Sequence, residues 1–163
     1  MAAQKEIVKA LKKIPWFAEL KPEHFERLAQ VATLREGKVG EELFKEGDKE
    51  DCVYVVLEGR VALHIFVPHH GKVRIYTAEP MDLIGWSVAT PVVRRRTAGA
   101  TVVQPGRLAA FSAEKIYQMC EEDHDFGYMF YRRIANIIAG RLMVTRLQLL
   151  DMFADYREER SNA

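Results

Sequence analysis

The chain has 163 residues, enough for one domain or for one domain with an appended helix. Its 24 lysines and arginines nearly cancel its 23 aspartates and glutamates, which excludes a general attraction to nucleic acid or to acidic surfaces. Two cysteines are too few for a disulfide framework, and no apolar run is long enough to span a membrane. The lysine-bearing N-terminus lacks the apolar centre of a signal peptide, so we expect a cytoplasmic location.

The first part of the chain, residues 5–32, has the apolar spacing of two short helices. One apolar stripe begins at Ile7, and Pro15 ends it. The second helix opens at Pro22, and its apolar face is expected to hold Phe25, Leu28, Ala29 and Ala32.

The middle of the chain, residues 33–112, changes to short apolar runs separated by glycine turns. Such regular spacing favours an all-β sandwich or roll over alternating strands and helices. Glycines at positions 47 and 59 are expected in tight turns that demand a positive φ. The predicted strands are residues 42–44, 52–57, 61–67, 73–77, 98–103 and 107–111.

The last part of the chain is predicted to be helical. Ser112 is a suitable N-cap for a short helix that ends near Cys120, and a long helix follows from about Phe126. We therefore divide the chain into residues 1–125 and a C-terminal dimerisation helix at 126–160. Apolar and small residues of that helix recur in alternating steps of three and four, at Ala135, Ile138, Leu142, Thr145, Leu149, Met152 and Tyr156. This is the seam of a two-helix coiled coil, so a parallel homodimer is expected, with packing inside one subunit as the alternative.

Three segments together resemble the cyclic-nucleotide-binding domains of the catabolite-activator and FNR-type regulators. They are IPWFAEL at residues 14–20, GEELFKEGD at 40–48 and VYVVLEGRV at 53–61. The resemblance implies a mainly β fold, a cyclic-nucleotide-binding-type β-roll (jelly-roll) flanked by N-terminal helices and a long C-terminal helix. It also implies a regulatory role rather than an enzymatic one. About seven residues follow Tyr156, too few for the DNA-binding domain of those regulators, so a stand-alone form is expected, with a truncated piece of a longer regulator as the alternative.

The resemblance also implies a phosphate-binding cassette at residues 82–98. In such a cassette, backbone N–H groups and one arginine hold an anion. Arg96 matches the family's arginine, and Arg95 is the second choice because Arg94, Arg95 and Arg96 follow one another. The remaining cassette residues expected at the ligand are Gly85, Trp86, Ser87, Thr97 and Ala98.

The cassette departs from the family pattern at Trp86. Nucleotide-binding members carry a glutamate there, which accepts a hydrogen bond from the ribose 2′-hydroxyl, and tryptophan cannot accept one. We therefore expect cAMP and cGMP to bind weakly or not at all, with Ser87 as a substitute only if the loop shifts. Thr145 and Arg146 match the pair that reaches the base in adenine-binding members, although Thr145 also suits a seam position.

The function predicted from these residues is small-molecule sensing, with an unidentified anionic ligand and no certain cofactor. The alternative is an interaction module with a degenerate pocket that recruits a protein partner, and a haem-binding variant ranks third. Metal binding by His64, His69 and His70 is rejected because we expect them to be surface loop histidines. A hydrolase is rejected because the chain has no G-x-S-x-G motif.

Overall fold

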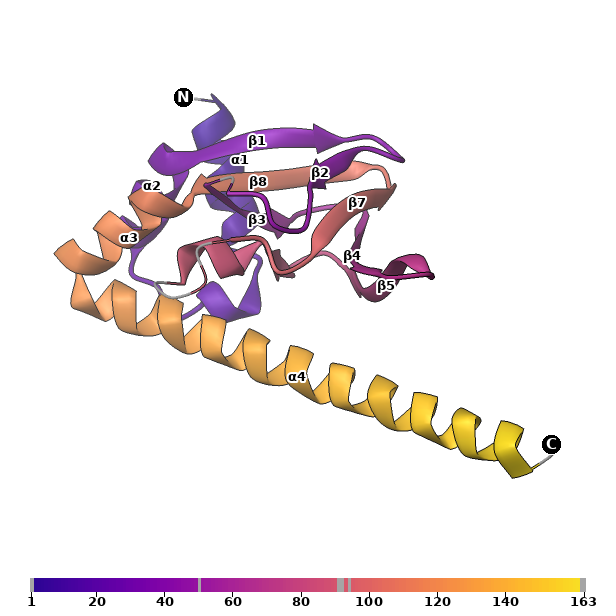
Figure 1. The fold of residues 1–163 in the computed structure, drawn as a ribbon. Helices are drawn as coiled ribbons and strands as arrows, with labels where there is room; N and C mark the ends of the chain where they lie inside the picture. Colours follow the sequence, from indigo (N-terminus) through magenta and orange to yellow (C-terminus); the bar gives the residue numbers. More distant parts are fainter. Residues whose placement is uncertain (1, 50, 91–92, 94, 162–163) are drawn as a thin grey trace. The chain divides into compact units, whose positions relative to one another are not determined.

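The computed structural model describes residues 2–49, 51–90, 93 and 95–161, which form helices and two antiparallel sheets (Figure 1). The chain separates into two units, Met1–Phe130 and Tyr131–Ala163. The helices are α1 (Ala2–Leu11), η1 (Pro15–Phe17), α2 (Pro22–Val31), η2 (Trp86–Ala89), α3 (Ala113–Glu122) and α4 (His124–Ser161). The strands are β1 (Ala32–Gly37), β2 (Glu42–Phe44), β3 (Cys52–Val56), β4 (Arg60–Val67), β5 (Gly71–Ala78), β6 (Leu83–Ile84), β7 (Gly99–Gln104) and β8 (Gly106–Ser112).

The eight strands form two four-stranded sheets, ordered β1-β8-β3-β6 and β2-β7-β4-β5. All six predicted strands are present, and their ends agree with the prediction to within two residues. Two strands were not predicted. β1 continues directly from α2, so Ala32 begins a strand instead of ending the helix, and β6 has only two residues.

The first unit has its main core between the two sheets. Each strand of that core presents alternate side chains to the interior. β3 is buried on both faces, because Tyr54 and Val56 enter the core while Val53 and Val55 line a small apolar cavity with Phe17 on the other face. Burial on both faces explains why β3 is a continuous apolar run in the sequence. The core contains Leu43, Phe44, Tyr54, Val56, Val61, Leu63, Ala78, Ile84, Ala100, Val102 and Leu108.

The helices after the sheets begin as the sequence predicts. The Ser112 hydroxyl accepts a hydrogen bond from the Lys115 N–H, which confirms it as the N-cap of α3.

Both cysteines are free thiols, and burial raises the pKa of Cys120 to about 12. Among the described residues, no helix combines the length and the apolar character needed to cross a membrane.

Gly59 lies where the β3–β4 turn approaches the backbone before β8. Its φ is +81°, in the left-handed region that glycine enters without steric cost. A Cβ on Gly59 would lie 2.5 Å from the carbonyl oxygen of Gln104. Gly40 has nearly the same φ, +83°, but a Cβ there would meet nothing within 4 Å. Alanine substitutions at the two positions can therefore distinguish the cost of the left-handed backbone from the cost of a close contact with the Cβ.

We predict that Gly40→Ala lowers the free energy of unfolding by about 1 kcal/mol, the cost of the left-handed conformation alone. Gly59→Ala should lower it by about 3 kcal/mol, because overpacking against a carbonyl adds to the same strain. Urea denaturation of both variants measures the difference. Equal losses would contradict the close approach at Gly59.

Candidate functional site

The cassette begins at Gly85, directly after β6. Gly85 has a φ of 72° and is the N-cap of η2. A Cβ at this position would lie 2.1 Å from Nη1 of Arg96. Only glycine therefore satisfies both the backbone conformation and the approach of the arginine.

The Arg96 side chain lies inside the first unit, with 2% of its surface exposed. Nη1 donates to the Gly85 carbonyl at 2.8 Å, and Nη2 donates to the Cys52 carbonyl at 2.5 Å. The guanidinium carbon lies 4.0 Å from the centroid of the Phe44 ring and 5.9 Å from that of Tyr54. Charge-assisted hydrogen bonds and a cation–π contact thus join the cassette to β3 and β2.

The backbone of Arg96 makes a second set of contacts, with the turn after β2. Its N–H donates to the Asp48 carbonyl at 2.9 Å, and its carbonyl accepts from the Gly47 N–H at 2.8 Å. Gly47 has the predicted positive φ, +86°. The glycine turn of the GEELFKEGD segment therefore fixes the end of the cassette, a contact that the sequence did not suggest.

The structure distinguishes the candidate arginines. Arg96 is buried, Arg95 is exposed, and Arg94 lies outside the described residues. Arg96, the first choice, is therefore the arginine whose side chain is enclosed by the cassette and its neighbours, whereas the side chain of Arg95 is exposed to solvent.

The other predicted cassette residues lie around Arg96. Ser87 is buried, and its hydroxyl accepts a long hydrogen bond, 3.4 Å, from the Thr97 N–H. Trp86 and Ala98 are partly buried, and Thr97 is exposed. The first unit therefore brings Gly85, Ser87, Arg96 and Thr97 together at one place.

Thr145 and Arg146 are exposed on α4 in the second unit. Their predicted contact with a base stays a prediction. The Tyr156 side chain of the proposed seam lies outside the described side chains.

The prediction for His64 was wrong. His69 and His70 are exposed at the β4–β5 hairpin tip, as expected, but His64 is a buried residue of β4. Its Nε2 lies 3.0 Å from the Thr101 hydroxyl, and Gly99 leaves the space for its ring. Burial lowers the pKa of His64, and Lys72 lowers it further. No cluster of metal-ligating side chains occurs within the described ranges.

Phe44 and Tyr54 are the site residues that the sequence analysis missed. Both belong to apolar strand runs, where a core position is the ordinary expectation. Their contact with Arg96 requires β2 of one sheet, β3 of the other sheet and the cassette to meet, which no local pattern encodes.

Comparison with known proteins identifies the fold. The family model of the cyclic nucleotide-binding domain matches residues 34–123. No curated protein sequence matches the chain closely enough to count as a relative.

Solved structures with this fold include a cyclic nucleotide-binding domain from Methylobacillus flagellatus KT, 22% identical, with a TM-score of 0.71 over 85% of this chain and 78% of that one. The sensor domain of the transcriptional regulator DNR from Pseudomonas aeruginosa is 16% identical, with a TM-score of 0.72 over 87% of this chain and 95% of that one. The regulatory subunit of a cAMP-independent protein kinase A from Trypanosoma brucei, in a triple mutant bound to cAMP, is 16% identical, with a TM-score of 0.71 over 83% of this chain and 47% of that one. One fold thus accompanies cAMP-bound and cAMP-independent proteins, so the fold alone does not name a ligand.

We predict that Arg96→Met lowers the free energy of unfolding by about 3 kcal/mol, because it leaves the Gly85 and Cys52 carbonyls without their charged donor. The same change at exposed Arg95 should cost no more than about 0.5 kcal/mol. Urea denaturation compares the two variants. Similar losses in both would contradict the structural role of Arg96.

Proposed function

Because the chain belongs to the cyclic nucleotide-binding domain family, we propose that it is a regulatory binding module whose cassette takes an anionic small molecule other than cAMP or cGMP. The observation that carries this proposal is the placement of Arg96. We assign the module no catalytic role.

Arg96 supports an anion site because its guanidinium is held in one orientation before any ligand arrives. Carbonyls on two sides and the Phe44 ring fix its plane. A preorganised charge loses less conformational entropy on binding than a mobile surface arginine does. The buried Ser87 hydroxyl, next to the Thr97 N–H, adds a polar group at the same place.

Trp86 opposes a cyclic nucleotide. An indole N–H donates and never accepts, so it offers nothing to the ribose 2′-hydroxyl that the family's glutamate would bind. Losing one charge-assisted hydrogen bond weakens binding about tenfold to a hundredfold. The anion site would therefore serve a ligand with no ribose or with a different polar edge.

A second candidate function is an interaction module with a degenerate pocket. The terminal nitrogens of Arg96 already donate to Gly85 and Cys52, and Phe44 lies against the guanidinium face. A ligand would compete with these contacts. In this function the arginine closes the site, and α4 recruits a protein partner.

We also propose that α4 forms a parallel homodimer. The part of α4 in the second unit exposes large apolar side chains, such as Leu142 and Met152, each with an exposed fraction of 68%. Leu149 is exposed on the same predicted seam. A stripe of this kind is unusual on a monomer surface, and a second copy of the helix would cover it.

We predict that Trp86→Glu increases the affinity for cAMP about tenfold to a hundredfold, because it restores a ribose acceptor. Trp86→Ala is the control, since it removes the indole without adding an acceptor. Isothermal titration calorimetry measures cAMP and cGMP binding to both variants and to the parent. Low-micromolar cAMP binding by the parent would overturn the proposed ligand class.

We predict that Leu142→Glu combined with Leu149→Glu abolishes the dimer, because each buried leucine at a seam contributes about 1.5–3 kcal/mol. The parent should have about twice the subunit mass of 18.7 kDa. The control pair, Leu147→Glu with Leu150→Glu, changes two exposed leucines of α4 that lie outside the predicted seam and should leave the dimer intact. Light scattering after size-exclusion chromatography measures the mass. A parent protein that stays monomeric at high concentration would contradict the proposed homodimer.

A further inference from the structure

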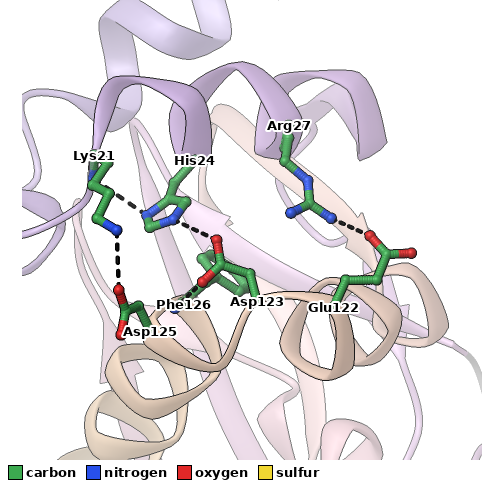
Figure 2. Close-up of polar contacts among 7 residues, drawn as sticks. All are labelled: Lys21, His24, Arg27, Glu122, Asp123, Asp125 and Phe126. Carbon is green, nitrogen blue, oxygen red and sulfur yellow. Dashed lines mark hydrogen bonds and ion pairs between the residues drawn. The ribbon is translucent and has the colours of Figure 1, made fainter.

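A buried histidine joins α2 to the start of α4. His24 lies in the first turn of α2 and is 1% exposed. Its Nε2 lies 2.9 Å from Oδ2 of Asp123, and the Lys21 backbone N–H donates to its Nδ1 at 3.2 Å (Figure 2). Both ring nitrogens are therefore engaged, one by each partner.

These contacts fix the tautomer of His24. Nδ1 accepts from Lys21, so it carries no hydrogen, and Nε2–H donates to the Asp123 carboxylate. A neutral imidazole thus satisfies both partners at once. An amide side chain, with one acceptor and one donor about as far apart, is another uncharged group that offers the same pair.

Asp123 connects this histidine to two helices. Its N–H donates to the Met119 carbonyl at the end of α3, and its carbonyl accepts from the Gly127 N–H at the start of α4. Its Oδ1 accepts from the Phe126 N–H at 3.0 Å, so the side chain caps α4. That bond is the main reason why the pKa of Asp123 is lowered, and the bond from His24 contributes to it.

The surroundings reinforce the pair. The His24 and Phe126 rings meet edge to face, with centroids 5.5 Å apart. Two ion pairs at the surface, Lys21–Asp125 at 3.0 Å and Arg27–Glu122 at 2.5 Å, lie on either side of the His24–Asp123 pair (Figure 2). Exposed ion pairs contribute little to stability. The contact of buried His24 with Asp123 is therefore expected to contribute most of the polar stabilisation between α2 and the start of α4.

We propose that the His24–Asp123 pair is a clasp that positions the first turn of α4 against α2. One carboxylate both caps α4 and receives the histidine, so the start of the helix cannot leave α2 without losing a contact of its own cap residue. The clasp goes beyond the proposed function, because it depends on no ligand in the cassette and on no second subunit.

The test is amide hydrogen exchange on the full chain, followed in α2, in residues 124–130 and in β3 and β8. Asp123→Ser keeps a good N-cap but is too short to reach His24. We expect exchange in α2 and in residues 124–130 to rise about tenfold, with β3 and β8 unchanged. Arg27→Ala, the control, removes an exposed ion pair and should change exchange less than about twofold.

Two histidine variants separate the clasp from simple packing. His24→Phe keeps a ring against Phe126 but loses both nitrogens, and should match Asp123→Ser. His24→Gln can accept from Lys21 and donate to Asp123, and should retain most of the protection. The double variant His24→Phe, Asp123→Ser should show no further increase, because both changes break one interaction.

Unchanged exchange in α2 after Asp123→Ser would overturn the clasp, since Asp123 would then be a helix cap alone. Additive effects in the double variant would overturn it too. If His24→Phe does not fold, Asp123→Ser with the Arg27→Ala control decides the matter.

Discussion

The buried guanidinium of Arg96 is the contact around which the candidate site is built. It bonds to carbonyls of Gly85 and Cys52, while its backbone bonds to the turn at Gly47 and Asp48. Removing a charged group from water is costly unless hydrogen bonds compensate. Gly85 of the cassette and Cys52 of β3 supply that compensation, and the turn after β2 holds the Arg96 backbone, so these three segments must keep their positions together.

This constraint links two glycines that the sequence pattern places in separate segments. Gly47 and Gly85, the N-cap of η2, lie far apart in the chain, yet both contact Arg96: Gly47 bonds its backbone, and Gly85 leaves space for its side chain. Arg96, the proposed anion contact, is thus also part of the buried interior of the fold. A change of ligand preference is therefore expected more readily at partly buried Trp86 than at Arg96, whose side chain and backbone both make hydrogen bonds within the fold.

The fold could be predicted from the sequence because its signals are local. Short apolar runs, glycine turns and the cap at Ser112 are each signals that span a few residues, and the six predicted strands follow from the first two. β1 and β6 were missed, because one continues directly from a helix and the other has two residues. The site was predicted only in part. The resemblance supplied Arg96, but the partners Phe44 and Tyr54, the burial of His64 and the clasp at Asp123 depend on contacts between distant segments.

The central claim, that the cassette takes an anionic small molecule other than cAMP or cGMP, is tested most directly by native mass spectrometry of the protein as purified. We expect a subunit mass above that of the polypeptide, with an acidic ligand released on denaturation whose mass differs from both cyclic nucleotides. Release of cAMP or cGMP would contradict the ligand class. A bare polypeptide that also shows no thermal shift with a panel of organic phosphates and carboxylates would contradict ligand binding itself and favour the interaction module.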